Sequence, residues 1–573
     1  MRNPAYVILF LFHFLFLENA LAQNSLYVAP SGNDANSGTS LSTPFKTIQK
    51  AANTAISGTT IYIKAGTYHE RIIPYTTGTP ANEIVMRPYQ NEKVIIDAAG
   101  TTGWNIFTFY GQAYIRLENL IFQFNDNTAA AYQSAIGFGK NSHHITIKKC
   151  QFNNMRNPSS NGIVFWGDDT TSAGVHHVLI DSCDFGDVSF NMSNGIVLNG
   201  NIHDIMISHS RIHNCKSAAI ICSGADSVSK KPMYDYVRDV VISNNKIDSN
   251  YNLVPGTYQS AVTINSCRNV VVDRNFIAEN DMAISITANK LNTVSASHIV
   301  RNNYIVHNHQ SGLNIGVYNT PIGGLVNKVK VLNNSLFQNA SLGNSYEIAC
   351  FPVDSLVLVN NLIYAGNAAN FIYTDWKGST SSYLVFDYNL FASPLAIPVA
   401  MNFVWDNQYC NGLGYYKSVS GQDLNSDFVL PLLVDESITS FNLHLFNTSP
   451  AINKGTMLWN ADLGNFDYDG QGRINGTSID VGADENWGDF VVPNVGNNVE
   501  LNKEAEIMKL GPEGQWVFSQ NLMNCQIYNE SAQLVLELNN ITEGDPLAFN
   551  PKGVFIVIAS SPTNQVYHQR IIK

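Results

Sequence analysis

A six-residue template recurs along most of this chain and restricts the folds that it can adopt. Each copy reads apolar, two variable residues, a small or amide residue, one more variable residue, and apolar again, as in IDSCDF at Ile180 and ISNNKI at Ile242. The fourth position is occupied in turn by Leu120, Cys150, Cys183, Ser210, Asn245, Asn275, Asn303, Asn334, Asn361 and Asn389, at spacings of 27 to 35 residues. A period of this length indicates a repeat architecture in which each unit contacts only its neighbours.

Each unit also carries a second run, in which apolar residues alternate with others. SNGIVFWG at residues 160–167 returns as SNGIVLNG at residues 193–200, and runs such as AVTIN and AISIT follow. Alternation over a few residues rich in Val and Ile is typical of short strands. Leucine-rich repeats have periods of about 20 to 29 residues and propeller blades of about 40 to 50, so neither fits. We therefore predict a parallel β-helix, in which each strand lies about 4.8 Å from its copy in the preceding coil.

The fourth position of the template is expected to point into the coil. An Asn there in successive coils can hydrogen-bond to its neighbours and to their backbone, which satisfies a buried corner. Cys or Ser can occupy the same place with a smaller side chain, so Cys150 and Cys183 are predicted to be stacked core thiols. None of the eight cysteines lies in a CxxC pair, so a zinc cluster or redox motif is unsupported, and we assign no metal-ligating residue.

The N-terminus, MRNPAYVILFLFHFLFLENALAQ, has the three parts of a signal peptide. Arg2 is the positive start, Ala5 to Leu17 is an apolar run, and ALA at residues 20–22 is a small-residue cleavage site. A membrane span needs about 20 apolar residues, and neither this run nor any later stretch is long enough. We predict a signal peptide over residues 1–22 and no transmembrane span.

Composition excludes two classes of protein. Charged residues make up only 14% of the chain, the formal net charge is −12, and no basic patch is present that could neutralise phosphates, so nucleic acid is not a partner. Hydrophobic residues make up 45%, which is too many for a disordered chain.

A solenoid needs covered ends, because its terminal coils would otherwise expose unpaired strands. The stretch STPFKTIQKAANTA offers Thr43 as N-cap and Pro44 as first helical residue of an N-terminal capping helix. The apolar stripe of this helix would consist of Phe45, Ile48, Ala52 and Ala55.

Both ends of this region resemble a known group. LYVAPSGNDANSGTSLSTPFKTIQKAAN, followed by GTTIYIKAGTYHERI, resembles the opening of secreted right-handed parallel β-helix proteins, a group rich in polysaccharide lyases and glycoside hydrolases. SPAINKG (449–455) and DYDGQGRINGTSIDVGADE (467–485) are similar to the terminal segment of many such bacterial proteins. The resemblance implies an all-β, pectate-lyase-like, right-handed solenoid over residues 23–490, and it leaves the reaction open.

Residues 491–573 resemble the C-terminal sorting domain that the type IX secretion system of Bacteroidetes reads. The match is carried by IYN at 527–529, GVFIV at 553–557 and the terminal IIK. It implies a small β-sandwich-like domain, the type IX machinery as a partner, and export to the cell surface or beyond. The alternative is an ordinary small β-domain. We expect a monomer.

The alternating strands also predict which residues face solvent. With Ile163 and Phe165 inward, Val164 and Trp166 face outward. The same register predicts the outward residues of the other coils: Gly137, Gly139, Val197, Asn199, Ile220, Cys222, Thr263, Asn265, Ser285, Thr287, Asn314 and Gly316. This face has no Asp, Glu, Lys, Arg or His. A uronate lyase needs Ca²⁺ on carboxylates, or Arg and Lys, to neutralise its acidic sugar, so a neutral polysaccharide fits better, with calcium left open as a cofactor.

Ionisable side chains occur instead in the turns after three successive strands. Asp168 and Asp169 follow the first, His203 the second, and Asp226, Lys230 and Tyr234 the third. Carboxyl groups two coils apart would start about 9.6 Å from each other. Inverting glycosidases hold the carboxyl groups of their acid and base at a similar separation, about 6.5 to 9.5 Å. We therefore predict Asp168, Asp169, Asp226 and His203 as catalytic residues. Trp166, Asn199, Tyr234 and Lys230 are predicted to bind substrate. Asp and Asn are also ordinary turn residues, so a structural role is the alternative.

Two function classes follow. The first is a secreted carbohydrate-active enzyme, a glycosidase with paired carboxylates or, as a variant, a polysaccharide lyase. The second is a non-catalytic surface protein that binds glycan or matrix along the strand face, which the uncharged character of that face favours. A β-helix fold alone does not decide between them.

Overall fold

The computed structural model describes residues 24–488 apart from 124–132, 156–159, 168–172, 187–191, 225–235, 253–257, 319–322, 342–344, 367–369, 379–380, 395–401 and 438–440; further on it describes 508–510, 516–518, 522–529, 534–542, 554–560 and 566–572. The predicted signal peptide lies outside this part. The chain divides into two units, one of residues 1–430, 453–474 and 478–483 and one of residues 431–452, 475–477 and 484–573.

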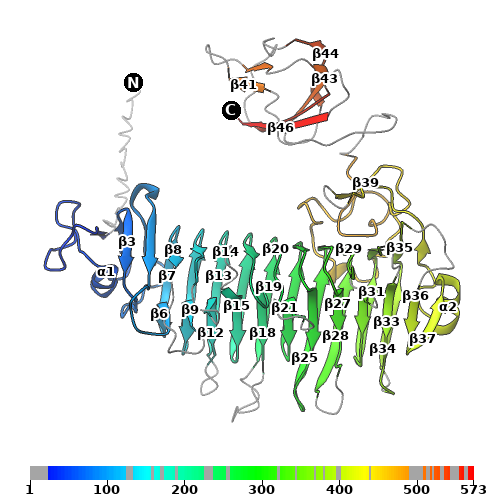
Figure 1. Ribbon diagram of the computed structural model, residues 1–573, viewed down its shortest axis with the longest axis horizontal. Helices are drawn as coiled ribbons and strands as arrows, with labels where there is room; N and C mark the ends of the chain where they lie inside the picture. Colours follow the sequence, from blue (N-terminus) through cyan, green and yellow to red (C-terminus); the bar gives the residue numbers. More distant parts are fainter. Residues whose placement is uncertain are drawn as a thin grey trace, which may run out of the picture. The chain divides into compact units, whose positions relative to one another are not determined.

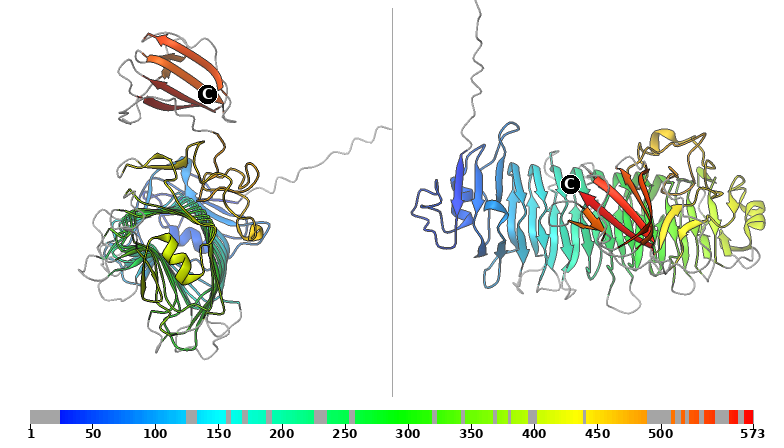
Figure 2. Two further views of the ribbon diagram at one scale, coloured as in Figure 1. Left: turned by 90° about the vertical axis from the view of Figure 1, so that its right-hand side faces the viewer. Right: turned by 90° about the horizontal axis from the view of Figure 1, so that it is seen from above.

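The first unit is a right-handed parallel β-helix, as the repeat and the resemblance predicted (Figure 1). Three sheets wind around one apolar core. The left view of Figure 2 looks along the axis of the coil. We call them sheets A, B and C. Within each coil the chain passes from sheet A to sheet B and then to sheet C. Each strand pairs in parallel with its copy in the next coil, except that the last pair of sheet C is antiparallel.

Sheet A consists of β1 (Ser25–Val28), β2 (Thr60–Ile63), β4 (Ile84–Pro88), β7 (Ala113–Glu118), β10 (His143–Lys148), β13 (Val175–Asp181), β16 (Ile202–Ser208), β19 (Val237–Ser243), β22 (Arg268–Asp273), β25 (Val294–Arg301), β28 (Leu325–Leu332), β31 (Ser355–Val359) and β34 (Tyr383–Asp387). Sheet B consists of β3 (Gly66–His69), β5 (Val94–Asp97), β8 (Ile121–Gln123), β11 (Gln151–Phe152), β14 (Asp184–Gly186), β17 (Arg211–His213), β20 (Lys246–Asp248), β23 (Phe276–Ala278), β26 (Tyr304–Val306), β29 (Ser335–Phe337), β32 (Leu362–Tyr364), β35 (Leu390–Ala392) and β38 (Asp427–Phe428). Sheet C consists of β6 (Asn105–Tyr110), β9 (Ser134–Gly139), β12 (Ser160–Trp166), β15 (Met192–Asn199), β18 (Ile220–Ser223), β21 (Ser260–Asn265), β24 (Met282–Thr287), β27 (Ser311–Ile315), β30 (Tyr346–Cys350), β33 (Asn370–Thr374), β36 (Asn402–Trp405) and β37 (Gln408–Asn411).

The repeated position between sheets A and B forms the predicted amide ladder. Its members from Asn245 to Asn389 are fully or almost fully buried. The Nδ2 of Asn303 donates to Oδ1 of Asn334 (2.9 Å) and to two backbone carbonyls, and its Oδ1 accepts from the amide nitrogen and the Nδ2 of Asn275. The same pattern repeats in the neighbouring coils, so each buried amide is satisfied by the coils on both sides.

Sulfur and hydroxyl groups occupy the ladder position in the earlier coils. Cys150 and Cys183 are buried free thiols that approach backbone carbonyls of their own and the preceding coil, which confirms their prediction as stacked core residues. The Oγ of Ser210 accepts from the amide nitrogen of Cys183.

A second amide ladder follows sheet B and was not predicted. Asn250, Asn280, Asn308 and Asn339 are buried and donate in turn to one another, at 2.8 to 3.0 Å between Nδ2 and Oδ1. The last of them donates to Oε2 of the fully buried Glu347 (2.7 Å). The first ladder also ends on a buried acid, because Asn389 donates to Oδ1 of Asp423 (2.8 Å). Both ladders therefore end on a carboxyl group.

Helices cover both ends of the coil. α1 (Ile48–Thr54) lies at the N-terminal end, but Thr47, not the predicted Thr43, is its N-cap and accepts from the amide nitrogen of Lys50. The prediction failed because Phe45 pairs with Val28 as extended chain and so delays the helix. At the other end, α2 (Leu413–Ser420) inserts Tyr416 against Phe403, with ring centroids 4.5 Å apart. This second cap was not predicted.

The segment after α2 returns along the coil. Asn333 donates to the backbone carbonyls of Asp480 and Gly482, and Asn360 donates to that of Thr456. These contacts attach residues 453–474 and 478–483 of the first unit to the turns between sheets A and B. Short 3-10 helices occur at η1 (Tyr89–Asn91) and η4 (Asn460–Asp462).

The strands described in the second unit pair in the antiparallel sense. β39 (Leu433–Asp435) pairs with β40 (Asn442–Leu445), and β41 (Met508–Leu510) pairs with β42 (Trp516–Phe518). A four-stranded sheet contains β43 (Leu522–Asn529), β44 (Leu534–Ile541), β45 (Val554–Ser560) and β46 (Val566–Ile572). Among the described residues, no helix is long and apolar enough to cross a membrane.

We predict that the ladder is a main source of coil stability. Replacing Asn303 by Ala removes one donor to Oδ1 of Asn334, the acceptor of the Asn275 donors, and one hydrogen bond to each of two backbone carbonyls, at a cost of about 3 kcal/mol. Equilibrium urea unfolding should show this loss, whereas Asn411→Ala, at an exposed position of β37, should change the free energy of unfolding by less than about 0.5 kcal/mol. Equal effects of the two substitutions would contradict a special role of the ladder.

The acid that ends the second ladder should make stability depend on pH. Burial raises the pKa of Glu347 to about 8, although the hydrogen bond from Asn339 opposes this rise. Between about pH 4.5 and pH 8 the unfolded chain releases this proton and the folded chain keeps it, so stability falls as pH rises through this window. Glu347→Gln removes the ionisation, and we expect its melting temperature to fall less than that of the wild type between pH 5 and pH 8. Parallel profiles of the two proteins would contradict this account.

Candidate functional site

The outer face of sheet C presents a row of polar and aromatic side chains. Trp166, Asn199, Ser223, Asn265 and Thr287 lie side by side in five successive strands, from β12 to β24. Trp166 is 41% exposed, and the next three side chains are partly exposed. We call these five residues the sheet C row. Four strand spacings give it a length of about 19 Å.

The predicted register was wrong in one coil. Ile220 and Cys222 are fully buried, because they pair with the inward Ile196 and Leu198. Their neighbours Ile221 and Ser223 face outward instead. AAIICS has two adjacent isoleucines, so its alternation does not reveal which of them points inward.

Sheet C has almost no charged side chains. In its strands as the structure describes them, Glu347 is the one Asp, Glu, Lys, Arg or His, and it is buried inside the coil. The predicted absence of charge on the outer face is therefore confirmed for these strands. Aromatic rings mark both ends of the face: Tyr110 is 55% exposed in β6, and Tyr346 and Tyr373 lie 5.0 Å apart in β30 and β33.

Most of the predicted ionisable site residues lie outside the described part of the chain. These are Asp168 and Asp169, which follow β12, and Asp226, Lys230 and Tyr234, which follow β18. β12, β15 and β18 are consecutive neighbours in sheet C, so the two loops leave the sheet two strands apart.

His203 lies in β16 of sheet A, close after the turn from β15. Its Nδ1 is 2.7 Å from Oδ2 of Asp204, and its Nε2 is 2.8 Å from the backbone carbonyl of Ala173. Both ring nitrogens therefore have a partner. Its catalytic role stays a prediction.

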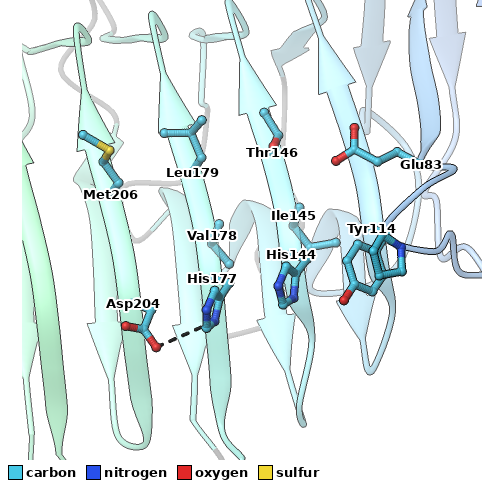
Figure 3. Close-up of a pocket in the computed structure, with 11 residues that line it drawn as sticks. Glu83, Tyr114, His144, Ile145, Thr146, His177, Val178, Leu179, Asp204 and Met206 are labelled. Carbon is cyan, nitrogen blue, oxygen red and sulfur yellow. Dashed lines mark ion pairs between the residues drawn. The ribbon is translucent and has the colours of Figure 1, made fainter.

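A shallow groove of about 460 Å³ lies on the outer face of sheet A (Figure 3). Its lining residues are Pro80, Glu83, Tyr114, His144, Ile145, Thr146, His177, Val178, Leu179, Asp204 and Met206. Tyr114, His144 and His177 stack in successive coils, with ring centroids 4.6 and 4.5 Å apart. Asp204 continues this row, and its Oδ2 lies 3.7 Å from Nδ1 of His177.

A second stack of imidazoles runs parallel to the first. His143, His176 and His203 occupy paired positions of β10, β13 and β16, with ring centroids 4.8 and 4.9 Å apart and almost parallel rings. We call the two stacks together the histidine array. Neighbouring histidines of one strand also touch, with Nδ1 atoms 2.8 Å apart for His143 and His144 and 2.7 Å apart for His176 and His177.

The backbone explains why two consecutive residues share one face. His144, His177 and Asp204 have φ angles of 51°, 52° and 55°, in the left-handed region. A left-handed residue interrupts the alternation of the strand, as at a β-bulge, so its side chain lies on the same side as that of the residue before it. The later coils repeat this feature at Asp239 and Asn269.

Crowding of imidazoles alters their protonation. Burial, together with the neighbouring imidazoles, lowers the pKa of His176 to about 4 and also lowers the pKa values of His143 and His144. Burial alone would raise the pKa of Asp204, but the hydrogen bond with His203 and the electrostatic effect of the neighbouring histidines together outweigh it, and the pKa lies below its usual value. His176 is therefore uncharged at neutral pH.

Four of these histidines were missed in the sequence. The signal is the dipeptide before each template: HH at 143–144, HH at 176–177 and HD at 203–204. Each dipeptide is unremarkable alone, and the array emerges only when the three coils are aligned.

Comparisons with known proteins agree with this architecture. The family described as "Right handed beta helix region" matches residues 134–322, and "Protein of unknown function (DUF1565)" matches residues 30–73. The chain is 25% identical over 434 residues to "Uncharacterized protein YwoF" of Bacillus subtilis, covering 73% of this chain and 90% of that protein.

Similarity to proteins with a stated activity is local or distant. "Pectate lyase PEL9" of Emericella nidulans is 37% identical over 92 residues, which cover 16% of this chain and 22% of that enzyme. A solved rhamnogalacturonan lyase has 13% identity and a TM-score of 0.43, covering 74% of this chain and 97% of that one. The family match and the coil geometry together establish a right-handed parallel β-helix.

Proposed function

We propose that this protein binds a neutral polysaccharide along the outer face of sheet C and hydrolyses it. The observation that carries the proposal is the sheet C row: an exposed indole followed by amide and hydroxyl side chains in successive coils. An indole can pack against the apolar face of a sugar ring, while amides and hydroxyls can exchange hydrogen bonds with sugar hydroxyls.

Charge favours a neutral chain. A polyuronate carries one carboxylate on each sugar, and a protein that binds it must supply cations or a bound metal ion at close range. The described strands of sheet C present no such group on their outer face. A neutral glycan requires none.

The chemistry would come from the loops that follow β12 and β18. Asp168 or Asp169 on one side and Asp226 on the other would start about 9.6 Å apart, two strand spacings. This separation is close to the range in which one carboxyl group protonates the leaving oxygen and the other activates a water, with inversion. Lys230 and Tyr234 belong to the second loop and would contact the sugar chain, as would Trp166 and Asn199 of the row.

The local similarity to a protein named pectate lyase supports a carbohydrate ligand. The similarity covers less than a quarter of that enzyme. It therefore does not support an elimination reaction for this chain. A non-catalytic glycan-binding scaffold is the second candidate, because the described strand face contains no exposed Asp, Glu, Lys, Arg or His.

Export is part of the proposal. The signal-peptide pattern of residues 1–22 and the sorting-domain resemblance of residues 491–573 support delivery to the cell surface or the medium by the type IX route. A polysaccharide outside the cell would then be accessible.

We predict hydrolysis that depends on the loop carboxyl groups. The mature chain, incubated with neutral and acidic polysaccharides, should release reducing ends from a neutral one without the ultraviolet absorbance of an unsaturated product. Asp169→Asn and Asp226→Asn should each lower kcat at least about 100-fold, the usual contribution of a general acid or base, while retaining binding. Asp168→Asn tests which of the two adjacent carboxyl groups acts.

Three other outcomes would count against this function. Ultraviolet absorbance would indicate elimination and overturn the neutral substrate. Activity that survives both substitutions would overturn the assigned carboxyl groups. Retention on a polysaccharide column without cleavage of any substrate would favour the binding scaffold.

Trp166 gives a test of binding that is independent of catalysis. Trp166→Ala should weaken binding of the neutral polysaccharide by about 1 kcal/mol, which is about fivefold in Kd. Trp487, which is equally exposed at 42% and belongs to the second unit, provides the matched control. Affinity electrophoresis in gels that contain the polysaccharide would measure both variants. Equal weakening in the two variants would argue against sheet C as the binding face.

A further inference from the structure

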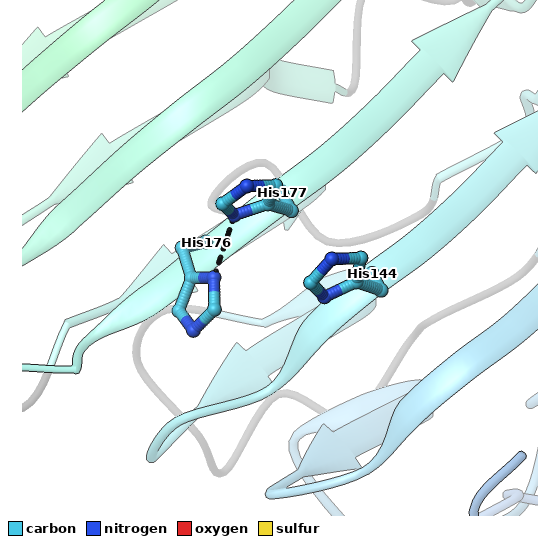
Figure 4. A group of neighbouring side chains, drawn as sticks. All are labelled: His144, His176 and His177. Carbon is cyan, nitrogen blue, oxygen red and sulfur yellow. Dashed lines mark hydrogen bonds between the residues drawn. The ribbon is translucent and has the colours of Figure 1, made fainter. Parts of the chain in front are cut away.

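The histidine array has the composition and spacing of a metal site. Figure 4 shows His144, His176 and His177 on β10 and β13, with their rings facing one another across two coils. One ring nitrogen of each lies within 4.8 Å of a ring nitrogen of the others. We propose that these three residues bind one divalent transition-metal ion of the zinc and copper class.

The distances suit such an ion. Zn²⁺ binds imidazole nitrogen at about 2.0 to 2.1 Å, so two ligands in a tetrahedral site lie about 3.3 Å apart. The Nδ1 atoms of His176 and His177 are 2.7 Å apart and share a hydrogen bond, so a metal ion can replace the shared proton after a small opening of the pair. His144 stacks on His177 with ring centroids 4.5 Å apart and would approach through a rotation of its side chain.

Imidazole selects the class of metal. Neutral imidazole nitrogen is a favoured ligand of Zn²⁺, Cu²⁺ and Ni²⁺, whereas Ca²⁺ and Mg²⁺ prefer oxygen. Three protein ligands leave at least one position for water or another small ligand. The site is open to it, because the side chain of His177 is 50% exposed.

Neighbouring groups would support the ligands. His203 stacks on His176 at 4.9 Å and is itself held at both nitrogens, by Asp204 and by the carbonyl of Ala173. The Asp204 carboxylate, 3.7 Å from Nδ1 of His177, adds negative charge beside the ion. Partners of this kind orient metal-binding histidines in proteins.

The array is limited to three coils. Ala113 precedes His143 in its row, and Arg238 follows His203. Arg238 donates to Oδ1 of Asn201 and to the carbonyl of Tyr236. The histidines are therefore a local feature of β10, β13 and β16, unlike the amide ladders that run through many coils. The site belongs to sheet A and does not depend on the glycan proposed for sheet C.

The test measures metal binding directly. The full chain, prepared without a polyhistidine tag and stripped with chelator, is titrated with Zn²⁺ and Cu²⁺ by calorimetry, with bound metal counted by mass spectrometry after dialysis. We expect one ion per chain and a higher melting temperature on binding. His144→Asn and His177→Asn should each weaken affinity more than about tenfold, at least the effect of losing a supporting partner.

The chain offers a matched control. Asn suits the left-handed backbone of positions 144 and 177, since Asn269 occupies the equivalent place in a later coil with φ of 55°. His209 is also left-handed, has a 61% exposed side chain and lies beside the carboxylate of Asp181, so His209→Asn should leave affinity unchanged. Melting curves of the metal-free variants verify folding.

Electron paramagnetic resonance of the Cu²⁺-loaded wild-type protein adds a readout that needs no variant. At least two nitrogen ligands are expected in its spectrum. Absence of stoichiometric binding, fewer than two nitrogen ligands, or equal weakening in His209→Asn would each overturn the proposed site.

Discussion

The hydrogen bond from one buried Asn to the next is the interaction on which this coil depends. Every link points the same way: the Nδ2 group donates toward the C-terminal coil and the Oδ1 atom accepts from the coil before it. A chain of donors with one direction ends on an acceptor oxygen from outside the ladder. Asp423 supplies it for one ladder and Glu347 for the other. The buried acids, which would otherwise be costly, are thus explained by the polarity of the ladders that they end.

The ladders also determine what the outer faces can present. Because they keep successive coils in register, an identical position in each coil becomes a straight row on the surface. On sheet C such a row consists of uncharged side chains and is about 19 Å long. On sheet A the equivalent rows consist of stacked imidazoles. One coil architecture therefore presents two chemically unrelated rows of side chains, on two different faces. Each row takes only one or two residues from each coil.

Much of the coil could be predicted from the sequence, because its repeat pattern matches the pairing of strands in successive coils. The strand stack and the Asn ladder follow from the period alone, because coils of nearly constant length place equivalent residues above one another. Thr43 was wrongly predicted as a cap because Phe45 continues a pairing with Val28 that local helix signals do not reveal. The histidine array was missed because a left-handed residue in each strand places two neighbours on one face. Asp168 and Asp226 lie in stretches without periodicity, where a pattern cannot orient a side chain.

The one-way amide ladder has a consequence for how such a chain can change length. In the first ladder, a coil between those of Asn245 and Asn389 receives one donor from the coil before it and gives one to the coil after it, so a duplicated coil inserts there without altering the links of either neighbour. Deletion of an interior coil is equally neutral for the remaining links. The coils that carry Asp423 and Glu347 lack this freedom, since each of these residues terminates a ladder. Growth by tandem duplication is therefore open to the middle of the solenoid, and surface rows can lengthen there while the capped end stays unaltered.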